Sequence, residues 1–305
     1  MDRNSINWRG YLPAITTPFD DQGLLSEPML RQLLQWLDGE RMHGIIITGT
    51  TGEWFNLTDG ERQRLFQVTG ETLKGRMTLI AGCTAYRASE SLRYANMAAE
   101  AGFDGILLTP PPYIRPADRE IYQFYADVSD ETPLPICVYN WPPGTNVDMS
   151  EDLLTRIADL DKVVAIKNST GSKQHFLNVF RKLKDRIRVF GVPINKEGAR
   201  LVTEEGADGQ MGAGAVLGRE HPKFFEDLWA GNIEDALRFA ERDSFLMKEW
   251  FHADYTARFG SAQAIFKTAL NLLGLPGGSP RRPILPLREN EVDMVRNTLR
   301  RLGKL

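Results

Sequence analysis

The stretch Val163–Lys167, with the sequence VVAIK, is the clearest indication of how this chain folds. Four apolar residues in succession precede the lysine, and such runs are typical of strands buried on both faces, as in a parallel sheet covered by helices. The runs IIIT, GILLT and ICVY share this continuous apolar character. We therefore expect a parallel sheet.

Short apolar runs of this kind recur at intervals of roughly 20 to 35 residues, which is the spacing of βα units. Helices are expected in the gaps, three of them beginning at the capping residues Ser26, Thr58 and Ser150. Because successive strands joined by short crossovers tend to be neighbours, eight such units favour a closed (β/α)8 TIM barrel, an α/β fold, over an open doubly wound sheet. The expected strands are Tyr11–Thr16, Gly44–Thr48, Met77–Ala81, Gly105–Thr109, Pro135–Asn140, Val163–Lys167, Arg188–Phe190 and Gly209–Ala213.

The 305 residues divide into two expected regions. We assign residues 1–231 to a catalytic barrel domain and residues 232–305 to a C-terminal helical region packed on the barrel. Helices are expected there at Ile233–Trp250, Ser261–Leu273 and Glu289–Leu302. The Pro- and Gly-rich sequence GLPGGSPRRPILP between the last two helices predicts a loop.

The charge pattern excludes several classes of partner. The 37 basic and 40 acidic residues are spread along the chain and give a net charge of −3, which argues against a nucleic-acid or polybasic membrane partner. No apolar run approaches the length of a membrane span. The first residues, MDRNSINWRG, lack the apolar core of a signal peptide, so we expect a cytoplasmic protein.

The sequence also offers no motif for a metal or an organic cofactor, and we expect neither. The two cysteines form no CxxC motif, and the four histidines show no HxxxH or HxH spacing. The glycine-rich run GQMGAGAVLG departs from the GxGxxG spacing of dinucleotide loops. We interpret His43, His175 and His221 as surface residues. The fourth, His252, lies in a loop from which it can face the barrel mouth.

Lys167 is the most informative residue, because it ends an apolar strand. Catalytic groups of TIM barrels lie at the C-terminal ends of the strands, and lysines are rarely buried without a partner. Burial disfavours the ammonium form, so we expect a lowered pKa and a neutral amine that can form an iminium with a ketone. The alternative is a lysine that extends from the strand end and pairs with a loop carboxylate.

Two neighbouring segments supply candidate partners for this lysine. Tyr139 ends the adjacent strand, where it serves either as a proton donor and acceptor or as a packed aromatic. Thr50 and Thr51 lie in the turn Gly49–Gly52, whose backbone N–H groups can hold a carboxylate, although Gly-Thr turns are also common structural features.

These segments together resemble the dihydrodipicolinate synthase / N-acetylneuraminate lyase family. The resemblance rests on GTTGE at Gly49–Glu53, on YN-x-P at Tyr139–Pro142 and on IKNSTG at Ile166–Gly171. It extends from Gly10–Phe19 to the helix SAQAIFKTAL. It implies a class I Schiff-base lyase on a TIM barrel, with a small-molecule 2-oxo acid as substrate. It also implies a homotetramer built as a dimer of dimers.

The resemblance also implies roles for individual residues. Lys167 forms the iminium, Tyr139 is the acid/base residue, Thr50 is the relay hydroxyl, and Thr51 with its neighbouring amides holds the substrate carboxylate. Tyr113 falls where the family supplies a tyrosine across the subunit interface, and its alternative is a loop aromatic after a proline run. The remaining residues expected to contact substrate are Gly49, Asn168, Ser169, Gly191 and Met211.

Two departures from the family bear on the substrate. Gly144 stands where dihydrodipicolinate synthases carry an arginine for the carboxylate of the aldehyde substrate, and Gly191–Ile194 lacks the carboxylates of sialic acid lyases. We therefore expect aldol cleavage or dehydration of a 2-keto-3-deoxy sugar acid or a similar compound. One alternative is 4-hydroxy-tetrahydrodipicolinate synthase, with Arg115 or Arg258 replacing the missing arginine. A second is a non-catalytic relative that binds a 2-oxo acid.

Overall fold

The computed structural model describes residues 1–305 and contains the eight parallel strands that the sequence predicts. They hydrogen-bond in the order β1-β8-β7-β6-β5-β4-β3-β2. Several are shorter than the apolar runs that predicted them, because the runs continue into the loops at the barrel mouth. The strands are β1 (Gly10–Tyr11), β2 (Gly44–Ile47), β3 (Thr78–Gly82), β4 (Gly105–Leu108), β5 (Ile136–Asn140), β6 (Val163–Asn168), β7 (Arg188–Phe190) and β8 (Gly209–Gln210).

The barrel closes through the segment that follows β1. Ala14 forms parallel bridges to Ile46 of β2 on one side and to Ala213, just beyond β8, on the other. The N–H of Ile46 donates to the carbonyl of Pro13 at 2.8 Å, and the N–H of Ile15 donates to the carbonyl of Ile46 at 3.0 Å. These contacts confirm the closed (β/α)8 TIM barrel and exclude the open sheet.

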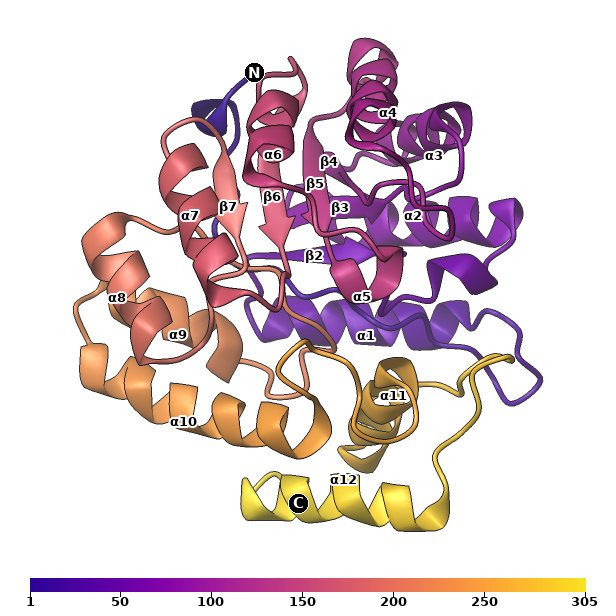
Figure 1. Ribbon diagram of the computed structural model, residues 1–305. Coiled ribbons are helices and arrows are strands. Elements are labelled where there is room, and N and C mark those ends of the chain that lie inside the picture. Colours follow the sequence, from indigo (N-terminus) through magenta and orange to yellow (C-terminus); the bar gives the residue numbers. More distant parts are fainter.

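Helices surround the barrel (Figure 1). One α-helix leads from each strand to the next, except that two helices, the first of them short, lie between β5 and β6, and a further helix follows the last strand. Thr58 and Ser150 cap their helices as predicted, accepting hydrogen bonds from the N–H groups of Glu61 and Leu153. Ser26 precedes its helix but makes no side-chain cap, so that prediction is wrong; Pro28 in the first turn leaves fewer N–H groups to cap. The surrounding helices are α1 (Glu27–Gly39), α2 (Asp59–Leu73), α3 (Ala88–Glu100), α4 (Asp118–Glu131), α5 (Pro142–Thr145), α6 (Glu151–Ala158), α7 (Lys173–Leu183), α8 (Lys196–Glu205) and α9 (Glu220–Trp229).

Two buried layers explain why the strands are continuously apolar. Side chains on one face of the strands, for example those of Ile46 and Ile80, belong to a small cluster that fills the barrel interior. The residues between, as at Ile45 and Leu79, belong to the large cluster between strands and helices. Because both faces lie away from water, neither requires polar residues.

Three further helices follow the barrel: α10 (Ile233–Trp250), α11 (Ala262–Leu272) and α12 (Glu289–Arg301). Figure 1 shows them in orange and yellow below the barrel mouth, with α11 beside the loops that follow the strands. All three were predicted, the first with the same bounds. No helix combines the length and the apolar character that a bilayer crossing requires.

We predict that Gly209→Ala destabilises the barrel at the β1–β8 contact. A Cβ at Gly209 would lie 2.0 Å from the carbonyl oxygen of Gly10, so the strands would have to separate, at a cost of about 2 kcal/mol or more. The measurement is urea denaturation, with Gly60→Ala as the matched control, because nothing lies within 4 Å of a Cβ at that helical position. Equal stability of Gly209→Ala and wild type would contradict the close β1–β8 contact.

Candidate active site

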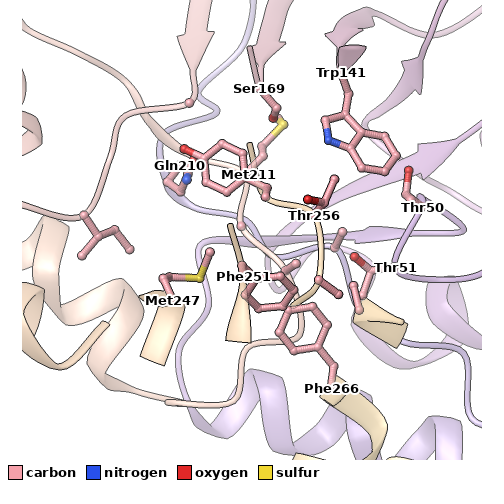
Figure 2. A pocket seen from close by; sticks show the side chains of 18 of the residues that line it. Thr50, Thr51, Trp141, Ser169, Gln210, Met211, Met247, Phe251, Thr256 and Phe266 are labelled. Atoms are coloured by element: carbon pink, nitrogen blue, oxygen red, sulfur yellow. The ribbon is translucent and has the colours of Figure 1, made fainter. Parts of the chain in front are cut away.

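A cavity of about 800 Å³ opens at the C-terminal ends of the strands. Figure 2 shows Thr50 and Thr51 on one side of it, Trp141 and Ser169 on another, and Met247, Phe251 and Phe266 from the C-terminal helices. The barrel alone therefore does not form the site. Nine of the ten predicted site residues line the cavity: Lys167, Tyr139, Thr50, Thr51, Gly49, Asn168, Ser169, Gly191 and Met211.

Lys167 lies on β6 between Tyr139 of β5 and Phe190 of β7. Its side chain is buried, with 7% of the residue exposed, and its Nζ lies 4.3 Å from the centroid of the Tyr139 ring. No carboxylate lies within ion-pair distance, so pairing with a loop carboxylate is not observed. Burial lowers the pKa of the Lys167 amine to about 8, with a small opposing contribution from Cys137. A substantial share of the amine is therefore neutral near pH 7.5.

Tyr139 is buried beside this amine, and its ring stacks on that of Trp141 at 6.1 Å with 8° between the planes. Burial raises the pKa of its phenol well above the usual range, and the hydroxyls of Ser169 and Thr50 act in the opposite direction. The phenol thus stays protonated and has two hydroxyl groups near it. This arrangement suits a group that donates a proton and recovers it through a relay.

Helix α11 anchors the loop that carries Thr50 and Thr51. Gln263 donates from Nε2 to the carbonyl of Thr50 at 2.9 Å. Lys267 donates from Nζ to Glu53 Oε1 at 2.5 Å, and both members of this ion pair are fully buried. Glu53 holds a left-handed backbone conformation with φ of +57°, which a non-glycine residue adopts only when its surroundings enforce it.

Sequence reasoning missed Gln263 and Lys267 as supports of the site. A signal was present, because they stand four residues apart within the apolar helix SAQAIFKTAL and therefore share one helical face. Two polar side chains on the buried face of a helix indicate specific polar partners.

Asn140 and Asn168 connect the ends of β5 and β6 below the mouth. Asn140 Nδ2 donates to Asp148 Oδ1 at 2.7 Å and to Asn168 Oδ1 at 3.0 Å. The Asn168 Nδ2 group is buried and has no partner within the protein. The side-chain oxygen of Asn168 therefore already accepts a hydrogen bond from Asn140. Its side-chain nitrogen Nδ2 is the atom that can still donate to another acceptor.

Gly144 has no room for a side chain. A Cβ at this position would lie 2.2 Å from the ring of Trp141, the same ring that stacks on Tyr139. An arginine at this site would have to displace Trp141. Of the two arginines considered as replacements, Arg258 lines the cavity and Arg115 does not.

Tyr113 is the one predicted site residue that lies outside the cavity of its own chain. It is 93% exposed, has a φ of +79°, and is not among the residues that line the cavity. The chain by itself does not bring this phenol to Lys167.

The prediction for His221 is wrong, because this residue is buried and not on the surface. Its ring stacks on Tyr11 at 4.2 Å, and its Nε2 lies 3.2 Å from Asp243 Oδ1. Neither partner is near it in sequence, so helical position alone could not reveal the burial. His252 is exposed and lines the mouth, as expected.

Comparison with known proteins agrees with this geometry. The model of the dihydrodipicolinate synthetase family matches residues 7–302. The chain belongs to this family. The resemblance stated from the motifs is thereby confirmed, and the protein is a lyase of the family's class I type.

Relatives of this family member resemble it over nearly its whole length. A 4-hydroxy-tetrahydrodipicolinate synthase of Thermotoga neapolitana is 32% identical, covering 98% of this chain and 100% of the relative. An uncharacterised DapA-like lyase of Rhizobium meliloti is 30% identical over 97% and 96% of the two chains. The solved dihydrodipicolinate synthase of Acinetobacter baumannii, complexed with pyruvate, is 26% identical over 97% and 99%, with a TM-score of 0.87.

We predict that Lys267→Met destabilises the protein by about 3 kcal/mol, because it leaves the Glu53 carboxylate buried and unpaired. Adding Glu53→Gln should restore part of this loss, since the remaining group is then neutral. Lys196→Met, at an exposed lysine on α8, serves as the control and should change stability little. Urea denaturation of the three variants and of wild type measures these differences. If Lys267→Met proved as stable as wild type, the ion pair would not anchor the loop.

Proposed function

We propose that this lyase acts on 2-oxo acids through an imine formed on Lys167. The observation that carries the proposal is a buried, unpaired amine with a lowered pKa, 4.3 Å from the ring of a buried phenol and facing a cavity. A buried amine with no counter-ion lowers the stability of the fold, so its presence at this position indicates a chemical role.

The first step joins the amine to the substrate. The neutral Nζ of Lys167 attacks the 2-oxo carbon, and the carbonyl oxygen takes a proton from Tyr139 to give a carbinolamine. Loss of that hydroxyl as water leaves the protonated imine. The Thr50 hydroxyl lies near Tyr139 and stabilises the resulting phenolate by hydrogen bonding until the phenolate takes a proton from the substrate in the second step.

The second step uses the imine as an electron sink. Tyr139 takes the proton of a C4 hydroxyl, C3–C4 breaks, its electron pair moves into the enamine, and an aldehyde leaves. In the alternative course a proton leaves C3, and the C4 hydroxyl then departs with a proton as water. In the cleavage course Tyr139 then returns its proton to C3 of the enamine, which restores the imine. Hydrolysis of the imine returns the free amine in both courses.

The shape of the cavity supports a hydroxylated 2-oxo acid as substrate. Its volume of about 800 Å³ exceeds the needs of pyruvate alone, and Trp141 occupies the space in which an arginine at position 144 would stand. We therefore favour a 2-keto-3-deoxy sugar acid or a similar compound. Synthesis of 4-hydroxy-tetrahydrodipicolinate, the activity named for several relatives, remains the alternative, because Arg258 lines the mouth.

The position of Tyr113 supports a site shared between subunits. Its phenol is 93% exposed and follows β4, whose C-terminal end lies on the same side as the cavity. We expect this residue to enter the relay of a second copy, within the homotetramer that the family resemblance implies.

We predict that borohydride traps pyruvate on the protein as a covalent adduct detected by intact mass. Lys167→Ala should abolish the adduct, whereas Lys196→Ala should retain it. Tyr139→Phe should form the adduct more slowly and lower turnover of a substrate panel by about 100-fold or more. Tyr122→Phe, on α4 away from the cavity, serves as its control. No adduct with wild type, or an adduct that persists in Lys167→Ala, would refute the imine mechanism.

A further inference from the structure

The cavity mouth carries two cations that no carboxylate of the chain neutralises. Lys248 lies near the end of α10, and Arg258 lies in the loop between α10 and α11. Both are exposed and line the cavity, and neither side chain forms an ion pair or a hydrogen bond within the protein. Many other arginines of this chain are paired, for example Arg64, Arg219 and Arg281.

The only carboxylate that lines the cavity is Asp243, and it is already engaged. Its Oδ1 lies 3.2 Å from His221 Nε2. Apart from the amine of Lys167, the basic lining groups that carry a charge are Lys248 and Arg258. A cleft lined by one sign of charge concentrates ligands of the opposite sign, so the mouth favours anionic compounds.

The backbone holds Arg258 firmly at this mouth. Its N–H donates to the carbonyl of Trp250 at 2.9 Å, and Phe251 and Ala257 form an antiparallel bridge. The N–H of His252 also donates to the carbonyl of Thr256 at 2.8 Å. The loop therefore folds back on the end of α10, and Figure 2 shows its Thr256 among the side chains that line the cavity.

The carboxylate next to the 2-oxo group does not account for these cations. In the proposed function that carboxylate binds the backbone of the Thr50–Thr51 turn, which follows β2, whereas Lys248 and Arg258 come from the C-terminal helices. Gly144, packed against Trp141, offers no other cation on the β5 side. The mouth therefore has a place for a second anionic group.

We propose that Arg258, supported by Lys248, binds an anionic group at the end of the substrate remote from the 2-oxo carbon. The inference rests on the proposed function and defines its substrate class more closely: a 2-oxo acid whose far end carries a carboxylate or a phosphate. A guanidinium matches both groups through paired N–H donors, which a lysine cannot reproduce.

Borohydride trapping of matched acids tests this without knowledge of the natural reaction. The two probes are 2-oxoadipate, which ends in a carboxylate, and 2-oxohexanoate, which has the same chain length and a neutral end. Wild type should reach half-trapping at about tenfold lower concentration of 2-oxoadipate. Arg258→Gln should bring the ratio close to one, and Lys248→Gln should lower it less. Arg300→Gln, at an exposed arginine on α12, removes the same charge outside the cavity and should leave the ratio unchanged.

The outcomes separate this inference from the proposed function. Trapping of pyruvate with equal trapping of the two six-carbon acids would overturn the inference alone, and so would a preference that Arg258→Gln leaves intact. Failure to trap pyruvate would overturn the imine mechanism and the inference with it. A six-carbon 2-oxo acid ending in a phosphate ester, trapped at still lower concentration than 2-oxoadipate, would support the inference and identify phosphate as the group bound.

Discussion

The burial of one amine away from water is the constraint on which the rest of this site depends. Lowering the pKa of Lys167 from 10.5 to about 8 corresponds to roughly 3 kcal/mol against its charged form. The packing of the barrel offsets this cost, because β6 lies between two strands whose residues are mostly buried and apolar. Tyr139 and Trp141 then cover the amine from the β5 side, where their stacked rings exclude water without supplying a carboxylate. The result is an amine that is both reactive and directed at the cavity.

The C-terminal helices contribute to the candidate active site and are not merely attached to the barrel. Helix α11 fixes the Thr50 carbonyl through Gln263 and the end of the turn through the buried Lys267–Glu53 pair. Buried ion pairs rarely add stability by themselves, but they impose a geometry because a misplaced member would be left uncompensated. The loop before α11 also brings Arg258 to the mouth. The barrel thus provides the proposed nucleophile, while the helices position its surroundings and shape the outer end of the cavity.

Much of this arrangement could be predicted from the sequence, because it follows from local patterns. Short apolar runs, several of them continuous like VVAIK, predicted every strand, and a lysine ending one of them indicated the candidate nucleophile. What could not be predicted depends on residues distant in the chain. The burial of His221 requires Tyr11 and Asp243, and the anchoring of Thr50 requires a helix more than two hundred residues later. The exclusion of a side chain at Gly144 depends instead on the side-chain conformation of Trp141, only three residues earlier. Ser26 shows that a local pattern can also mislead, because it stands at the capping position of its helix but its side chain forms no capping hydrogen bond.

Titration of Lys167 itself tests the central claim most directly. Lysine labelled with ¹³C at Cε gives one resonance for each side chain, and Lys167→Ala identifies the resonance of interest. We predict a midpoint near pH 8 for Lys167, well below the value of about 10.4 that is ordinary for solvent-exposed lysines. A Lys167 resonance that titrates together with the exposed lysines would show that the amine is solvated and charged at neutral pH, and would contradict the account.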